Sequence, residues 1–185
     1  TKKSIALIEA AKAEGLNVTC SVTPYHLIFC DEDLHNYDTN LKVNPPLRTR
    51  EERDALIEAV KNGTIDFIAS HHRPQDYDHK VCEFEKAAFG METLETVFSA
   101  AITAGISADL FVKMQSENIR SIFGLEAMDI NEGSPAALTL FFPSRDITYT
   151  RENLFSKSDN NAFLEKALKG KVWGTINKNR VFRSR

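Results

Sequence analysis

One helix framed by two short apolar segments constrains the fold of this chain more than any other feature. Residues 17–23 and 65–70 are rich in β-branched and apolar side chains, which favours strands. Thr49 to Glu52 form a capping box, in which the Thr49 hydroxyl caps the Glu52 N–H and Glu52 reaches back. The helix opened by this box should end near Gly63, directly before the second strand. This order of strand, helix and strand predicts the parallel sheet of a barrel or a doubly wound fold.

Further elements are predicted on both sides of this unit. Apolar residues at helical spacing predict helices over residues 5–11, 93–104, 109–114 and 118–123. In the second of these, Leu94 belongs to the expected buried stripe. After Gly133 the pattern changes and predicts strands over residues 137–143, 147–149, 172–176 and 180–182. We therefore expect an α/β part followed by a small β module.

Composition and charge exclude several classes of protein. A chain of 185 residues that is 42% hydrophobic can form one domain with a sizeable core. A net charge of −3 with scattered Lys and Arg argues against a nucleic-acid groove, and we expect no membrane span or signal peptide. Cys20, Cys30 and Cys82 form no close pair, which suggests reduced thiols in a cytoplasmic protein. Since the first residue is Thr1 and a helix begins at once, we expect a piece of a longer protein, or else a processed N-terminus.

Histidines after the second predicted strand form the first candidate site. His71 and His72 come directly after residues 65–70, and neighbouring side chains on a strand point to opposite faces. Both can bind one metal only where the backbone turns. His26, after the first strand, is able to share a site with one of them. The alternative, which the spacing favours, is that these imidazoles hydrogen-bond to loops.

Other polar residues fit ligand binding or a plainer role. Asn44, beside two prolines, is a rigidly held amide suited to an amide or carboxylate ligand, although Asn-Pro is also a common turn. Arg48 fits either a substrate carboxylate or a surface position before the helix cap. Phe89 and Gly90 either let backbone N–H groups approach a ligand or form a bend. The cysteines lack a convincing His partner, so we expect no thiol nucleophile.

Four segments together resemble the C-terminal half of the dihydroorotases, a family of bacterial zinc amidohydrolases. The segment at residues 44–48, Asn-Pro-Pro-Leu-Arg, is the most specific, and the segments keep the order and spacing of the family. The resemblance covers nearly the whole chain and weakens after about residue 135. The matching segments are residues 22–27, 37–48, 62–69 and 88–96.

The resemblance implies a fold and a reaction. Residues 1–130 would be the C-terminal portion of a (β/α)8 barrel of the TIM type, and residues 131–185 the C-terminal part of a small β-sandwich module. The reaction would be reversible hydrolysis of dihydroorotate to N-carbamoyl-aspartate in pyrimidine biosynthesis. Zinc would serve as cofactor, because it lowers the pKa of its bound water to about 7. The implied partners are a small-molecule substrate and further copies of the chain in a homo-oligomer.

The resemblance also assigns site residues. Asn44 falls on a substrate-binding Asn, Gln75 on a substrate-binding His, and Phe89 and Gly90 on backbone contacts to substrate. His71 falls on the metal-ligating, catalytic Asp of the family. The remaining metal ligands of the family would precede this chain.

The chain departs from the family at this motif. Family members have Asp-His-Ala-Pro-His where residues 71–75 read His-His-Arg-Pro-Gln. An imidazole binds zinc, but a zinc-bound His71 cannot also accept the proton of hydroxide. Loss of a general base costs about 10²- to 10⁴-fold in rate. Arg73 places a cation near the metal, and Ala137 and Phe142 replace Asp residues common in the closing strand of the family.

Two functions therefore stand side by side. The first is dihydroorotase itself, and the second is a non-catalytic homologue that acts as a structural partner, for instance of aspartate carbamoyltransferase. A cyclic amidase of the hydantoinase type is a weaker third interpretation, because residues 44–48 match the dihydroorotase branch.

Overall fold

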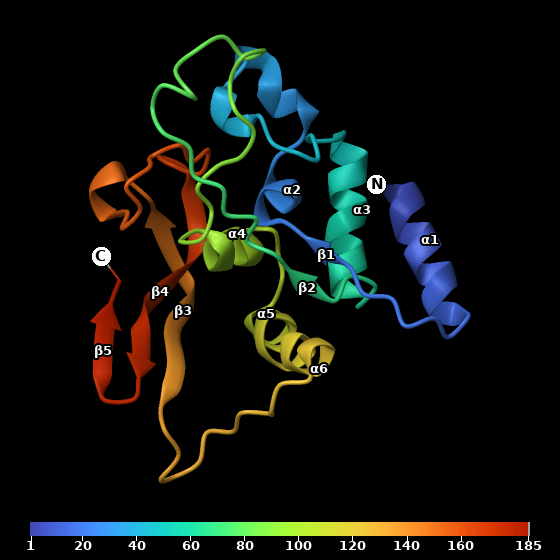
Figure 1. Ribbon diagram of the computed structural model, residues 1–185, viewed down its shortest axis with the longest axis vertical. Helices are drawn as coiled ribbons and strands as arrows, with labels where there is room; N and C mark the ends of the chain where they lie inside the picture. Colours follow the sequence, from blue (N-terminus) through green and yellow to red (C-terminus); the bar gives the residue numbers. More distant parts are fainter. Residues whose placement is uncertain (185) are drawn as a thin grey trace.

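A two-stranded parallel sheet lies within the N-terminal part of the computed structural model, which describes residues 1–184 (Figure 1). Strand β1 (Ser21–Val22) pairs in parallel with β2 (Phe67–Ile68), and α3 (Arg50–Lys61) lies between them in sequence. The predicted parallel pairing is confirmed, but both strands are shorter than predicted. The first ends because Pro24, with its fixed φ and missing N–H, opens α2 (Pro24–Ile28).

Helix α1 (Lys2–Ala13) packs beside α3 at the outer edge of the molecule (Figure 1). The predicted capping box is only half formed. The Thr49 hydroxyl accepts the Glu52 N–H at 3.4 Å, as predicted. The Glu52 carboxylate instead accepts the backbone N–H of Lys2, so this side chain ties α3 to the first turn of α1.

The long loops above the parallel sheet contain only short helical turns. The 3-10 turns η1 (Asp31–Asn36) and η2 (Thr39–Leu41) precede α3, and residues 69–96 form no regular helix or strand. Figure 1 shows these two loop regions together at one end of the molecule. The next helices run almost without a break: α4 (Val97–Thr103), α5 (Ala108–Val112), the π-helical η3 (Lys113–Asn118) and α6 (Ile119–Phe123).

The C-terminal part is a three-stranded antiparallel sheet in the order β3 (Ala137–Thr148), β4 (Ala167–Asn177) and β5 (Arg180–Arg183). The strands predicted over residues 137–143 and 147–149 are one strand. Its register shifts between Phe142 and Asp146, around Pro143, which cannot donate a hydrogen bond to the ladder. The turn η4 (Arg151–Asn153) begins the connection from β3 to β4.

Two hydrophobic clusters hold these parts together. One packs Tyr25 and Phe29 of the N-terminal part against Phe163 and Leu168 near β4, so the C-terminal sheet shares a core with the α/β part. The other lies under α3 and the parallel sheet and includes Val60. Within residues 1–184, every helix is too short or too polar to cross a lipid bilayer.

Candidate functional site

The backbone turns sharply at His71, directly after β2. His71 has a φ of 49°, in the left-handed region that β-carbon-bearing residues rarely adopt. As a result the two neighbouring imidazoles have separate partners. His71 Nδ1 lies 2.5 Å from the Tyr25 hydroxyl, whereas His72 Nδ1 accepts the N–H groups of Thr93 (3.3 Å) and Leu94 (3.2 Å). The predicted pair therefore does not converge on one point.

Tyr25 is the buried partner in the contact with His71. Its side chain is only 1% exposed, and burial raises the pKa of its phenol, against a smaller opposite influence of the neighbouring Thr23 hydroxyl. The phenol is therefore protonated at neutral pH and available as a donor. Its ring centroid lies 4.8 Å from that of His26 and 6.2 Å from that of His71, so the Tyr25 ring neighbours both imidazoles.

His26 has a structural role. Its Nε2 lies 3.4 Å from the Pro46 carbonyl, which only accepts, so Nε2 carries the proton. Its Nδ1 then accepts from the Thr23 hydroxyl at 2.7 Å. Burial lowers the pKa of His26 and keeps it neutral. Both nitrogens are thus engaged, and His26 holds the loop at Pro46 in place, as the alternative prediction has it.

Gln75, Phe89 and Gly90 come together around Asn160. The Gln75 N–H donates to Asn160 Oδ1 (2.9 Å), and the Gln75 side-chain amide donates to the Phe89 carbonyl (3.1 Å). Asn160 Nδ2 donates to the Gly90 carbonyl at 3.2 Å, and the Gly90 N–H donates to the Lys42 carbonyl at 2.9 Å. The segment that leads to Asn44 therefore runs directly beside Gly90.

Asn44 and Arg73 are the free polar groups here. The Asn44 side chain is exposed and makes no hydrogen bond within residues 1–184. The Arg73 guanidinium likewise has no hydrogen bond or ion pair in the described part of the chain, and the stem of this side chain covers Gly90. A Cβ on Gly90, whose φ is 111°, would lie 2.8 Å from the Arg73 Cβ. Only glycine fits under Arg73.

Two buried charged residues that the sequence patterns do not reveal, Lys80 and Glu92, hold the loop of residues 71–96. Lys80 is 5% exposed and donates to the carbonyls of Thr39 (2.7 Å) and Ala88 (2.8 Å). Burial lowers its pKa from 10.5 to about 8. Glu92 is fully buried and accepts from the Asn161 amide at 2.5 Å. The partners Thr39 and Asn161 are distant in sequence, so no local pattern points to either residue.

Glu92 also approaches His72, with 3.5 Å between its Oε1 and Nδ1. This contact is no ion pair, because His72 Nδ1 accepts two backbone N–H groups and carries no proton. Burial raises the pKa of Glu92, whereas the hydrogen bond from Asn161 and the nearby His72 lower it to a lesser degree. We therefore assign Glu92 and His72 to the support of the loop.

Residues 1–184 do not by themselves form a zinc site. Among residues 1–184, no three His, Cys, Asp or Glu side chains are grouped so that they could hold one metal ion. His71 gives Nδ1 to Tyr25, and Arg73 adds a positive charge two residues later. A zinc ion prefers anionic or lone-pair donors, and this donor set supplies one imidazole nitrogen at most.

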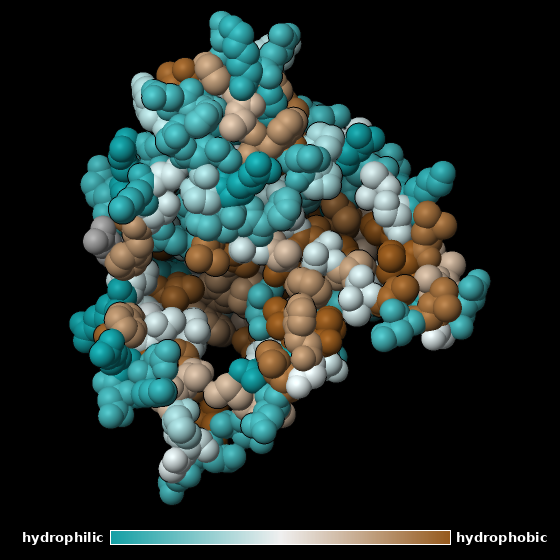
Figure 2. All heavy atoms as spheres, viewed as in Figure 1, coloured by the Kyte–Doolittle hydropathy of each residue, from teal (hydrophilic) through white to brown (hydrophobic). Residues whose placement is uncertain are grey.

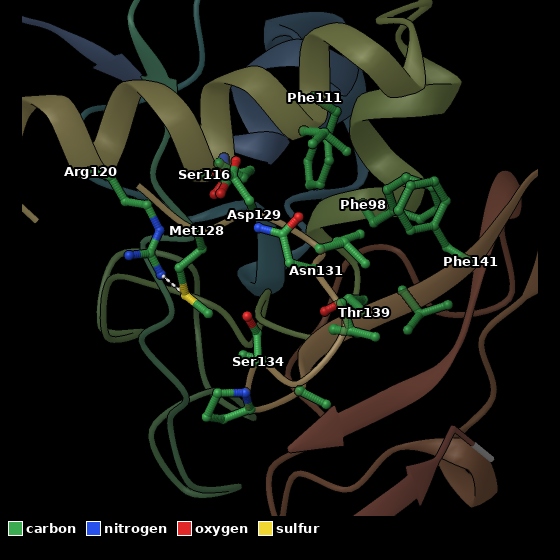
Figure 3. A pocket seen from close by; sticks show the side chains of 18 residues that line it. Phe98, Phe111, Ser116, Arg120, Met128, Asp129, Asn131, Ser134, Thr139 and Phe141 are labelled. Carbon is green, nitrogen blue, oxygen red and sulfur yellow. Dashed lines mark hydrogen bonds between the residues drawn. The ribbon is translucent and has the colours of Figure 1, made fainter. Parts of the chain in front are cut away.

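A cavity of about 650 Å³ lies elsewhere, between the helices α5 and α6 and the start of β3. Figure 2 shows a hollow on this face with hydrophobic residues inside it. Phe98, Phe111 and Phe141 line its apolar side, and Arg120 lies at the opposite side beside Met128 (Figure 3). None of the predicted site residues lines this cavity, so its size alone does not make it the active site.

Comparison with known proteins finds relatives that match almost the whole of this chain over part of their own length. No known protein-family model matches the chain. The dihydroorotase of Fusobacterium nucleatum is 36% identical over 185 residues, a match that covers 97% of this chain and 44% of the relative. The chain thus spans less than half the length of the curated relatives it matches.

Solved structures give the fold. The L-hydantoinase (dihydropyrimidinase) of Arthrobacter aurescens superposes with a TM-score of 0.89 at 25% identity, over 99% of this chain and 43% of that protein. The inactive dihydroorotase-like domain of a CAD-like multifunctional protein from Chaetomium thermophilum gives a TM-score of 0.65 at 22% identity, over 100% of this chain and 52% of that one. The chain is therefore a mixed α/β protein with the amidohydrolase fold, homologous to the C-terminal part of the dihydroorotases.

Proposed function

We propose that this chain is the C-terminal part of a dihydroorotase-type cyclic amide hydrolase. Residues 1–130 would complete a (β/α)8 barrel, and residues 131–185 would complete a small β-sandwich module. The reaction is the reversible hydrolysis of dihydroorotate to N-carbamoyl-aspartate. Sequence identity of 36–42% to proteins named dihydroorotase, along almost the whole chain, is the observation that carries this proposal.

The geometry supports a ligand site at the ends of β1 and β2. Asn44 offers an unpaired amide, and Gln75, Phe89 and Gly90 are held beside it by Asn160 and Lys42. An amide that offers one acceptor and two donors suits a ligand with both ring amides and a carboxylate. We assign substrate binding to Asn44 and to the Gln75, Phe89 and Gly90 loop.

Catalysis would require zinc, which supplies an activated hydroxide when it is bound. His71 stands at the position that the family resemblance gives to the catalytic Asp. The resemblance would make His71 a metal ligand, and its Nδ1 is already engaged by Tyr25.

One observation favours a second function. His71 bonded to Tyr25, followed by the cation of Arg73, suits a site that has lost hydrolysis. The second proposal is a non-catalytic homologue that acts as a structural partner, for instance of aspartate carbamoyltransferase. The inactive dihydroorotase-like domain with the same fold supports the existence of such proteins.

Zinc content measured together with dihydroorotate turnover decides between the two, in the longer protein that carries this chain together with the upstream part that would supply the remaining metal ligands. Stoichiometric zinc with ordinary turnover supports the enzyme and counts against a site disabled by His71. A zinc-free longer protein without turnover supports the non-catalytic homologue. Binding to aspartate carbamoyltransferase by analytical ultracentrifugation then tests the partner, and sedimentation of the two proteins as separate species counts against it.

A further inference from the structure

The surrounding residues determine which of Tyr25 and His71 donates the hydrogen bond between them. The Tyr25 phenol is buried and protonated, so its proton needs an acceptor. Within residues 1–184, His71 Nδ1 is the acceptor at hydrogen-bond distance, 2.5 Å away. If His71 Nδ1 carried a proton, that proton would face the phenol oxygen and the phenol would have to donate elsewhere.

The Tyr25 phenol makes no hydrogen bond to the neighbouring Thr23 hydroxyl within residues 1–184, where its hydrogen-bond partner is His71. The Thr23 hydroxyl proton goes to His26 Nδ1, which must accept because His26 Nε2 donates to Pro46. Its oxygen also receives the His26 N–H, at 3.4 Å. The arrangement that satisfies every group therefore has Tyr25 donating to His71.

We infer that Tyr25 fixes His71 as the neutral tautomer protonated on Nε2, so that this imidazole presents an N–H donor to a ligand oxygen rather than a lone pair to zinc. The inference rests on the proposed ligand site at these strand ends. Tyr25 is thus a positioning residue, which acts on the ligand through His71.

The ligand class is set by the donors that are present. His71 offers Nε2–H, and the Arg73 guanidinium is unpaired among the described residues. Glu92, the nearby buried carboxyl, points to Asn161 and His72 instead. These groups suit an anionic oxygen, such as the carboxylate of a small organic acid, and they recognise it without a metal.

The ¹⁵N–¹H correlation spectrum of the imidazoles in the uniformly ¹⁵N-labelled chain tests this directly. His71→Asn identifies the His71 signals by their loss. We expect Nδ1 at the chemical shift of an unprotonated nitrogen and Nε2 at that of a protonated one. The tautomer protonated on Nε2 should exceed the other by on the order of tenfold. One equivalent of ZnCl₂ should leave these signals in place. A proton on Nδ1, or a zinc-induced shift of His71 Nε2, overturns the inference.

Tyr25→Phe should let His71 exchange between tautomers. Tyr149→Phe is the matched control, because Tyr149 is also buried and its hydroxyl bonds to Ser99 (3.0 Å) and the Glu95 carbonyl (3.1 Å), away from His71. Identical His71 spectra in both variants would show that Tyr25 does not set the tautomer. The wild-type spectrum alone decides the question if Tyr25→Phe fails to fold. Neither readout uses turnover or substrate, so failure of the proposed function is detected separately.

Discussion

Tyr25 and His71 follow paired positions of the two parallel strands at the same offset. Val22 of β1 is in register with Ile68 of β2, and each of the two residues comes three positions later. Parallel strands end at the same edge of a sheet, so this offset brings the phenol and the imidazole to 2.5 Å. The strand ends thus assemble a buried donor under an exposed imidazole, at the place where α/β proteins bind ligands.

Asn44→Ala should weaken binding of N-carbamoyl-L-aspartate by about tenfold, because the ligand loses hydrogen bonds worth about 1.4 kcal/mol. Stability should change by no more than about 0.5 kcal/mol, since the Asn44 side chain is exposed. Isothermal titration calorimetry measures the affinity. Asn36→Ala, at another exposed asparagine, is the control and should bind normally. Equal affinity in the two variants would remove Asn44 from the site.

Gly90→Ala should destabilise the chain by at least about 1 kcal/mol more than Gly63→Ala, as measured by urea unfolding. Both glycines have a positive φ, of 111° and 83°. A methyl group on Gly90 would lie 2.8 Å from the Arg73 Cβ, whereas nothing lies within 4 Å of that position on Gly63. The comparison therefore isolates the contact with Arg73. Equal losses would mean that the loop moves aside at no cost.

Lys80 should make stability rise with pH between about 8 and 10.5. Its pKa falls from 10.5 to about 8 in the folded chain, so in this window the unfolded state holds the additional proton. The free energy of unfolding then increases with pH, by up to about 1.4 kcal/mol per unit.

Urea unfolding of wild type and Lys80→Met across this range isolates the effect. The difference in stability between them should widen in favour of wild type as the pH rises. Lys86→Met, at an exposed lysine of the same loop, should parallel wild type. A pH-independent difference between wild type and Lys80→Met would show that Lys80 titrates normally in the folded state.

Elements that depend on neighbouring residues, such as helix caps and the strand–helix–strand order, are predictable from the sequence. The Thr49 and Ser107 caps form, and the parallel pairing around α3 is present. The buried helical stripe predicted from the sequence includes Leu94, which is instead 61% exposed. Residues 94–96 form a turn, and α4 begins only at Val97.

The tertiary contacts that hold the site lie beyond local patterns. Glu52 reaches α1 rather than its own cap, because the N–H of Lys2 lies within its range. Lys80 and Asn160 find partners 41 and 70 residues away, at Thr39 and Gly90. Such contacts depend on how the loops pack, and neither periodicity nor spacing encodes that packing.

Calorimetric titration of the wild-type chain with N-carbamoyl-L-aspartate in the presence of EDTA is the most direct test of the proposed site. Asn44, His71 and the loop at Gly90 should recognise this ligand of the dihydroorotase family through their own donors. We predict saturable binding at one site per chain, unchanged by the chelator. Absence of binding, or binding that EDTA abolishes and zinc restores, would contradict it.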